Sequence, residues 1–304
     1  MRCVTQFGTK EYDGTAVALG YFDGVHLGHR AVLDAAVRCA QTQGLTPAAF
    51  TFTLPHGGAG KGQRIFSQEE KLRRMAACGI NAVLCPPFEA FSALTPRQFV
   101  AGVLVGTLGA KHVFSGGDFT FGAHKSGNVE MLQTLCAEYG VTAHIVPTAL
   151  YAGAPISSTR IRAALAAGDV ALAGALLGEA YSLEGAVRHG QGLGHTLGFP
   201  TVNLTYPAGM LVPKSGVYVT QTLVDGVWRP SATGLGTRPT VSDSGEVTCE
   251  TFLPGFTGDL YDAQVRVRFV RWLWATEKYD SLTALTEMVE RAAREALKGP
   301  AAAQ

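Results

Sequence analysis

The chain has 304 residues, and at about 150 residues per domain this length predicts two domains. Its 25 Lys and Arg residues nearly balance 24 Asp and Glu residues, so the formal net charge is +1, which argues against binding nucleic acid through bulk positive charge. Hydrophobic residues (47%) fall in the normal range, whereas charged residues (16%) are scarce against an average of roughly 25%. Glycine is enriched, at 37 residues, without a Gly-X-Y repeat, which predicts loops that approach a ligand closely.

Targeting and redox signals are weak. Met1–Gly14 lacks the apolar core of a signal peptide, and the longest apolar stretch, around Phe99–Ala110, is too short to span a bilayer. We therefore expect a cytoplasmic protein that does not enter a membrane. Six cysteines show neither a Cys-x-x-Cys pair nor a metal-site spacing, and we interpret them as ordinary thiols in a reducing compartment. They are Cys3, Cys39, Cys78, Cys85, Cys136 and Cys249.

The first half alternates predicted strands with predicted helices. Short apolar runs predict strands at Thr15–Gly20, Thr46–Phe52, Asn81–Cys85, Lys111–Ser115 and Thr142–Val146. Helical spacing predicts helices at Arg30–Gln43, Gln68–Cys78, Pro96–Leu108 and Asn128–Tyr139. This alternation predicts an α/β, Rossmann-like domain with a parallel sheet covered on both faces. Ligands of such sheets bind beyond the carboxyl ends of the strands.

The pattern changes near residue 180, which predicts domains at 1–180 and 181–304. The second half has strand-like runs without helices between them, at Ser182–Arg188, Gly216–Val224, Val227–Leu235, Val247–Leu253 and Gln264–Val270. Asp225-Gly226 predicts a hairpin turn. One helix follows Asp280-Ser281, with apolar residues at helical spacing from Leu282 to Ala296. We predict a small antiparallel β-barrel or sandwich with a C-terminal helix.

Two segments of the first domain have residue types suited to phosphate. The first predicted strand leads into Gly20–His29 and then into a helix, whose start offers free N–H groups to an anion. His26 and His29 could both face a phosphate there. Two ordinary capping or surface histidines explain the same pattern, and a metal site is a third reading, although no additional ligand stands nearby.

The second segment is Ile156–Arg162, which begins an Ala-rich helix that ends near Gly168. Ser157 or Ser158 can cap this helix, and Arg162 could hold phosphate oxygens in a bidentate contact. Taken alone, the segment is better explained as a capped helix with solvent-facing arginines.

Together and in this order, the two segments resemble the nucleotidylyltransferase superfamily. More specifically, they resemble the adenylyltransferase domain of the bacterial bifunctional riboflavin kinase/FMN adenylyltransferase (FAD synthetase) family. Gly117–Gly122 resembles that family's Gly-x-Asp-Phe-x-Phe-Gly stretch, and the resemblance extends from about Val17 to Leu285. It implies that the FMN phosphate attacks the α-phosphorus of ATP, which releases pyrophosphate and forms FAD.

The resemblance also implies residue roles in this reaction. His26, His29 and Arg162 would be catalytic, and Asp118 and Phe121 would contact the flavin. The ATP-binding residues would be Gly20, Phe22, Asp23, Gly28, Ser158 and Thr159. The family's Phe-Asp-Pro-His-Pro after the second strand is replaced here by Phe52-Thr53-Leu54-Pro55-His56, so the contacts of that loop are not carried over.

The second domain has a glycine-rich segment, His189–Gly194, shortly before Thr201-Val202-Asn203. Closely spaced glycines can admit a phosphate chain to the backbone, and Thr201 and Asn203, two apart on an extended segment, would offer oxygens to Mg²⁺ from one side. A glycine-rich hairpin alone is an ordinary feature of β domains. Matched with four more segments, it resembles the riboflavin kinase domain: Gly216–Tyr218, Gly236–Thr240, Glu250-Thr251 and Gly258–Tyr261.

This resemblance implies that ATP and Mg²⁺ are used to phosphorylate riboflavin to FMN. The residues that would bind ATP are Gly190, Gly192, Gly194 and Thr201. The metal would be bound by Thr201 and Asn203. Glu250 would be the base that takes the proton of the ribityl hydroxyl.

Five positions depart from the usual kinase pattern, namely His195, Val202, Gly234, Phe252 and Trp274. Two of them, His195 and Trp274, stand where arginine is customary, and losing two positive charges weakens phosphate binding. We predict that Trp274 stacks on the isoalloxazine ring instead.

The leading hypothesis is therefore a bifunctional enzyme whose partners are the small molecules riboflavin, FMN, FAD and ATP, with no nucleic acid. The alternative is an FAD synthetase whose kinase domain is degenerate and mainly binds flavin. A non-catalytic flavin sensor is a third hypothesis, against which the retained His26, His29, Arg162, Thr201, Asn203 and Glu250 argue. The sequence predicts no particular oligomeric state.

Overall fold

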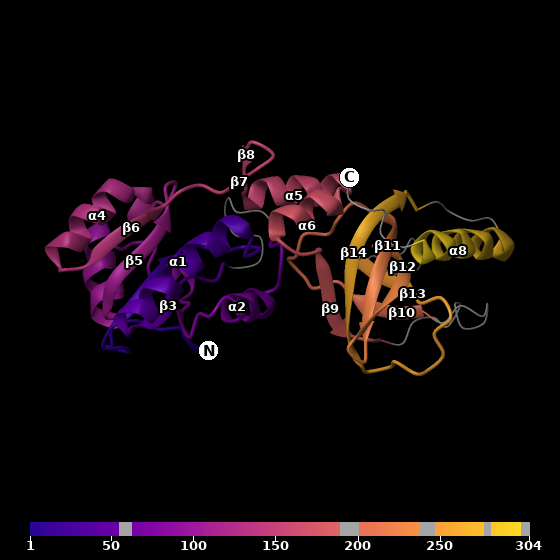
Figure 1. The fold of residues 1–304 in the computed structure, drawn as a ribbon, viewed down its shortest axis with the longest axis horizontal. Coiled ribbons are helices and arrows are strands. Elements are labelled where there is room, and N and C mark those ends of the chain that lie inside the picture. Colours follow the sequence, from indigo (N-terminus) through magenta and orange to yellow (C-terminus); the bar gives the residue numbers. More distant parts are fainter. Residues whose placement is uncertain (55–62, 189–200, 238–246, 277–280, 299–304) are drawn as a thin grey trace. The chain divides into compact units, whose positions relative to one another are not determined.

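The computed structural model describes residues 1–54, 63–188, 201–237, 247–276 and 281–298. The chain divides into two compact units, Met1–Ser158 and Thr159–Gln304, and Figure 1 labels their elements. The division falls before the boundary near residue 180 expected from the sequence. The second unit therefore includes helix α6 (Val170–Leu177). It also includes helix α5 (Ser158–Ala167) except for its first residue.

The first unit is built on a six-stranded sheet in the order β1-β4-β3-β2-β5-β6, with every pairing parallel. The strands are β1 (Arg2–Val4), β2 (Thr15–Leu19), β3 (Thr46–Phe50), β4 (Ala82–Leu84), β5 (Ala110–Gly116) and β6 (Thr142–Val146). The five strands predicted from the sequence are confirmed, whereas the edge strand β1 was not predicted.

Helices connect these strands. They are α1 (Leu27–Gln43), α2 (Gln68–Ala77), α3 (Pro96–Gln98), which continues into the π-helix η2 (Phe99–Thr107), and α4 (Val129–Glu138). Short helical turns are η1 (Phe88–Ala90) and η3 (Ala123–Lys125), and a small hairpin joins β7 (Leu150–Tyr151) to β8 (Ala154–Pro155). All four predicted helices are present, although the third is mainly a π-helix.

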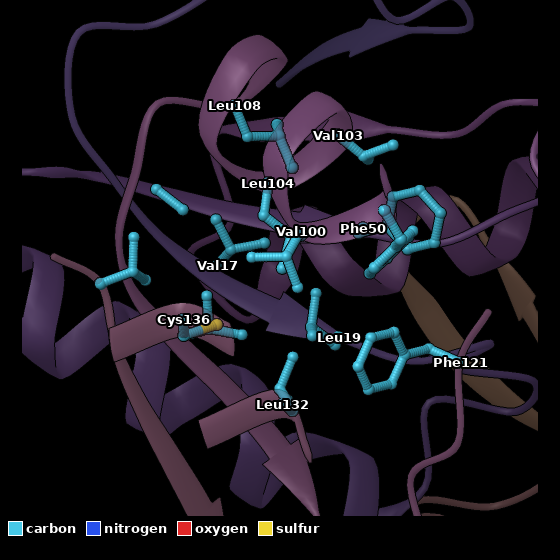
Figure 2. Close-up of a cluster of buried hydrophobic side chains, with 14 of the residues drawn as sticks. Val17, Leu19, Phe50, Val100, Val103, Leu104, Leu108, Phe121, Leu132 and Cys136 are labelled. Carbon is cyan, nitrogen blue, oxygen red and sulfur yellow. The ribbon is translucent and has the colours of Figure 1, made fainter. Parts of the chain in front are cut away.

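Both faces of the sheet are buried, as a parallel sheet requires. Along β2 the side chains alternate, so that Val17 and Leu19 join one hydrophobic cluster while Ala16 and Ala18 join the other. Figure 2 shows the first cluster, where Val17 and Leu19 lie among Leu104 of η2 and other apolar side chains. The second cluster is covered by α1 and α2.

Strand β2 lies at the point where the strand order reverses, because it pairs with β3 on one side and β5 on the other. In open parallel sheets the ligand crevice lies outside the carboxyl ends of the strands at such a point. The loop that begins at Gly20 follows β2, and the loop that begins at Gly117 follows β5. The topology therefore places two of the predicted motifs at this position.

The second unit contains a six-stranded antiparallel sheet in the order β10-β13-β12-β11-β14-β9. Its strands are β9 (Ser182–Ala186), β10 (Thr201–Thr205), β11 (Gly216–Val224), β12 (Val227–Thr237), β13 (Val247–Phe252) and β14 (Gln264–Trp274). The Arg188 N–H donates to the Asn203 carbonyl (2.9 Å), which brings the two edges together into a nearly closed barrel.

The predicted barrel with a C-terminal helix is confirmed. Helix α8 (Leu282–Leu297) begins at Ser281, whose hydroxyl accepts a hydrogen bond from the Ala284 N–H (3.2 Å). Asp225 and Gly226 both have positive φ, as the predicted hairpin turn requires. No helix in the described part of the chain has the length and apolar character needed to cross a membrane.

Candidate active sites

The two predicted catalytic histidines stack against each other at the start of α1. His26 is the N-cap residue, and its Nδ1 accepts a hydrogen bond from the His29 N–H (3.2 Å). The two rings are 3.6 Å apart between centroids and nearly parallel, at 15°. Because Nδ1 of His26 is an acceptor, the neutral ring carries its proton on Nε2, which is then the donor. His26 therefore caps the helix through Nδ1, and Nε2 is the ring nitrogen that carries the proton.

The loop before this helix is strained. Phe22 and Val25 have positive φ (55° and 42°), a conformation that is rare for a β-branched residue such as Val25. Such conformations cost about 1–3 kcal/mol each and persist only where their surroundings hold them. Here the Arg30 Nε–H donates to the Val25 carbonyl (3.2 Å) and the Ile65 N–H donates to Asp23 Oδ1 (3.0 Å). The buried Asp23 carboxylate, predicted to bind ATP, thus anchors its own loop.

The second phosphate signature meets the first one within the same unit. The Ser158 hydroxyl donates to the Asp23 carbonyl (2.9 Å), and a Cβ added to Gly28 would lie 3.4 Å from the Ile156 carbonyl oxygen. Asp23 and Ser158 are 135 positions apart in the sequence, so the two segments converge in the fold. Thr159 is exposed and Arg162 half-buried on α5, which belongs to the second unit from Thr159 onward.

The third motif, Gly117–Gly122, follows β5. Asp118 is exposed there, so its carboxylate is accessible. Phe121 is only 6% exposed and packs on Phe99, with ring centroids 5.6 Å apart. Gly122 has a φ of 74°, and a Cβ would lie 2.8 Å from the Pro96 ring, so this position requires glycine. Phe121 mainly supports the core, and its contact with flavin stays a prediction.

The predicted kinase residues gather on the outer face of the barrel. Asn203 of β10 lies opposite Glu250 of β13, and Thr201 lies opposite Phe252. The residues between them on both strands, such as Val202 and Thr251, are buried inside the barrel, so these four side chains share the outer face. Glu250 is exposed. The sequence did not predict that β10 and β13 are neighbours, because strands in sequence order do not pair here.

Trp274 lies in the same cross-strand row as Glu250. The row runs through Gly234, opposite Glu250, and Val217, opposite both Gly234 and Trp274. Three steps of about 4.8 Å separate the Glu250 and Trp274 backbones by about 14 Å. The Arg291 guanidinium of α8 lies over the Trp274 ring (4.4 Å to the centroid), and Trp274 packs in the cluster beneath this helix.

The donors near Glu250 suit a hard cation. The Thr201 hydroxyl and the Asn203 amide oxygen stand on one face beside the Glu250 carboxylate, and oxygen ligands of this kind are those that Mg²⁺ prefers. Within the described ranges no group of three or more His, Cys, Asp or Glu residues is spaced to hold a metal ion. Gly190, Gly192, Gly194 and His195 lie outside the described residues.

Comparisons with known proteins support both the adenylyltransferase assignment of the first part of the chain and the riboflavin kinase assignment of the second. Residues 9–160 match the family model described as FAD synthetase, and residues 177–298 match the one described as riboflavin kinase. Residues 161–176, the remainder of α5 and most of α6, lie between the two matches.

Relatives match along nearly the whole chain. Proteins named bifunctional riboflavin kinase/FMN adenylyltransferase are 33% identical in Bacillus subtilis (95% of this chain, 93% of the relative) and 34% identical in Pseudomonas fluorescens (96% of each). The one from Escherichia coli K12 is 35% identical, over 92% of this chain and 90% of the relative. A solved structure titled macrolide-efflux protein from Streptococcus pneumoniae has a TM-score of 0.83, at 26% identity, over 99% of this chain and 100% of that chain.

Proposed function

The chain belongs to the bifunctional riboflavin kinase/FMN adenylyltransferase family, and we propose that it makes FAD from riboflavin in two ATP-dependent steps. In the first step a riboflavin hydroxyl attacks the γ-phosphate of ATP, which gives FMN and ADP. In the second the FMN phosphate attacks the α-phosphorus of a second ATP, which gives FAD and pyrophosphate. The observation that carries this proposal is the match of both family models on one chain, FAD synthetase over residues 9–160 and riboflavin kinase over residues 177–298.

In adenylyl transfer, His26 and His29 stabilise negative charge on the ATP phosphates. Their position at the start of α1 adds the free N–H groups and the positive dipole end of that helix. The glycines Gly20 and Gly28 allow the nucleotide to approach the backbone, with Phe22 and Asp23 shaping the loop. Ser158, Thr159 and Arg162 hold the triphosphate, and Asp118 and Phe121 line the flavin side. Transfer of this kind depends on positioning and charge stabilisation more than on covalent catalysis.

In the kinase reaction, Glu250 accepts the proton of the ribityl hydroxyl as this oxygen attacks. Its exposure on the barrel and its place beside Asn203 support this role. Thr201 and Asn203 would hold Mg²⁺, which when bound neutralises charge on the ATP phosphates. The backbone of Gly190, Gly192 and Gly194 would contact those phosphates. The Trp274 side chain would contact the isoalloxazine ring.

A degenerate kinase domain is not favoured, because Thr201, Asn203 and Glu250 are retained and share one face. The departures at Gly234 and Phe252 lie beside this face, so we expect them to change substrate affinity rather than remove the base. We place the functional boundary between the two activities near residue 180, and the protein in the cytoplasm, with no nucleic-acid partner.

Product analysis tests the proposal directly. Purified protein is incubated with ATP and Mg²⁺ and either riboflavin or FMN, and flavins are separated by chromatography. We expect FMN and FAD from riboflavin, and FAD from FMN. Glu250→Gln should abolish FMN formation and still convert supplied FMN to FAD, whereas His29→Ala should do the reverse. Wild-type protein that forms no FMN would refute the kinase assignment, and failure to adenylylate FMN would refute the other.

A further inference from the structure

Lys71 of α2 is buried at the edge of the sheet where the adenylyltransferase loops begin. The residue is 4% exposed, and its ammonium donates hydrogen bonds to the Tyr21 carbonyl (3.2 Å), Thr51 Oγ1 (3.0 Å) and the Phe52 carbonyl (3.2 Å). All three acceptors are uncharged, and they follow β2 and β3 directly. A buried cation whose hydrogen-bond acceptors are all uncharged carries a large desolvation cost, so a direct hydrogen-bonded ion pair does not explain its presence.

The ammonium connects two loops that otherwise belong to separate strands. Thr51 is fully buried and donates its own hydroxyl proton to the Tyr21 carbonyl (2.9 Å), so that Lys71, Thr51 and Tyr21 form a closed triangle of hydrogen bonds. The Lys71 ammonium also lies over the Tyr21 ring (4.8 Å to its centroid), and that ring packs on Phe52, with centroids 4.8 Å apart. The side chains of Lys71 and Thr51 therefore both connect the loop after β2 to the loop after β3, and Lys71 is the one that contacts Tyr21, Thr51 and Phe52 together.

The tie acts next to the strained part of the loop. Tyr21 precedes Phe22, the first of the two residues with positive φ, and the strained stretch ends at Val25, directly before His26. Asp23 is held in the middle of this stretch by Ile65 and Ser158. Lys71 holds its beginning, so that releasing this end lets the strain relax toward the histidines.

We propose that Lys71 is a positioning residue for adenylyl transfer, which holds His26 and His29 in place by tying the loop after β2 to the loop after β3. Lys71 lies outside every motif through which the chain resembles its family, and touches neither histidine in the contacts described. The inference rests on the proposed roles of the two histidines.

The charge of Lys71 offers a readout that a purely structural residue would not have. Burial lowers the pKa of its ammonium to about 8. Cys85 directly after β4, Asp23 in the loop after β2 and Cys3 in β1 act to raise this pKa, while Arg64 before α2 lowers it. A neutral amine has two N–H groups for three oxygen acceptors, so raising the pH through 8 removes one of the three hydrogen bonds that Lys71 donates. We therefore expect adenylyl transfer to decline above pH 8.

The experiment compares Lys71→Met with Lys111→Met, a control that removes a positive charge from the exposed start of β5. Both activities are measured in the full chain. For Lys71→Met we expect kcat for FAD formation from FMN to fall about 100-fold, the cost of a small displacement of catalytic groups, with unchanged kcat for riboflavin phosphorylation. KM for FMN and ATP should stay within about threefold, because a positioning residue acts on the transition state. The Lys111→Met protein should match the wild type.

A milder variant and a pH series complete the test. Thr51→Val keeps the side-chain volume, removes one corner of the triangle, and should lower the FAD-forming kcat about fivefold. The wild-type decline in FAD formation between pH 8 and 9 should be absent in Lys71→Met, with riboflavin phosphorylation in the same samples as the reference for pH effects on ATP and Mg²⁺.

Three results would overturn the proposal. The first is FAD formation by Lys71→Met within about twofold of wild type, which would mean that Lys71 has no positioning effect. The others are a parallel loss of both activities and a loss of FMN binding, either of which would make Lys71 purely structural. Failure of the histidine roles themselves is seen separately, as FAD formation that survives His29→Ala.

Discussion

Replacing Gly28 by alanine tests whether the position of the His26 ring limits adenylyl transfer. Gly28 lies in the first turn of α1, and a Cβ there would be 3.2 Å from both Cε1 and Nδ1 of His26 and 3.4 Å from the Ile156 carbonyl oxygen. Carbon atoms in contact prefer a separation of about 3.5–4.0 Å, so the His26 ring must move by about 0.5 Å. Because a misplacement of about 1 Å can cost 100-fold, we expect FAD formation to slow about 10-fold.

Stability should move little in this variant. Alanine is favoured over glycine within a helix by up to about 1 kcal/mol, and the close contact with His26 offsets that gain. The assay is FAD formation from FMN by chromatography, alongside riboflavin phosphorylation and a thermal melt of the same protein. The matched control is Gly102→Ala in η2, an exposed glycine with nothing within 4 Å of its Cβ position, which should keep both activities and raise the melting temperature slightly, because no close contact offsets the helix-propensity gain. Unchanged FAD formation by Gly28→Ala would show that the ring position is not what limits this reaction.

Three further outcomes follow from the fold and the kinase face. Phe121→Ala should destabilise the first unit by about 3–5 kcal/mol, measured by denaturant unfolding, because the ring is 6% exposed and packs on Phe99; a loss below about 1 kcal/mol would contradict its place in the core. Chelation of divalent cations should stop FMN formation. Thr201→Val should raise the Mg²⁺ concentration needed for the half-maximal rate about tenfold. An unchanged Mg²⁺ titration would show that Thr201 is not a metal ligand. Desolvation, and secondarily His112 (3.2 Å between ring nitrogens), lowers the pKa of His144; the unfolded state therefore binds more protons, and stability should fall as the pH drops below about 6.5. His144→Phe should lose part of this pH dependence in melts at pH 7.5 and 5.5, and an identical dependence would argue against the pair as its source.

Much of the fold could be predicted because local patterns encode it. Strand β2 is buried on both faces and therefore reads as an apolar run, while α1 shows an apolar stripe at helical spacing. The elements that were missed lack such patterns. Strand β1 has three residues and begins with Arg2, and α6 is apolar all round. Their positions depend on pairing partners far away in the sequence.

The candidate sites divide in the same way. His26 could be singled out from the sequence, because a loop that binds phosphate constrains the residues next to one another in the chain. Glu250, on strand β13, could be named only through the resemblance to the riboflavin kinase domain. The sequence could not show that Asn203 lies opposite Glu250, nor that Phe121 belongs to the core, since both depend on which strands and helices become neighbours. A composition rich in glycine and close to neutral was consistent with local phosphate sites, but it could not place them.

By itself, then, the sequence determined two domains, their fold classes and the reactions that their motifs resemble, because these properties follow from periodicity and from residues close together in the chain. Only the tertiary structure decided that Ser158 reaches the loop of His26, that the kinase residues share one outer face, and that Lys71 is buried against two loops. A lysine in an amphipathic helix looks like any exposed lysine in sequence. Its burial depends on carbonyl oxygens about 20 and 50 residues away along the chain, which the strand order of the sheet brings together.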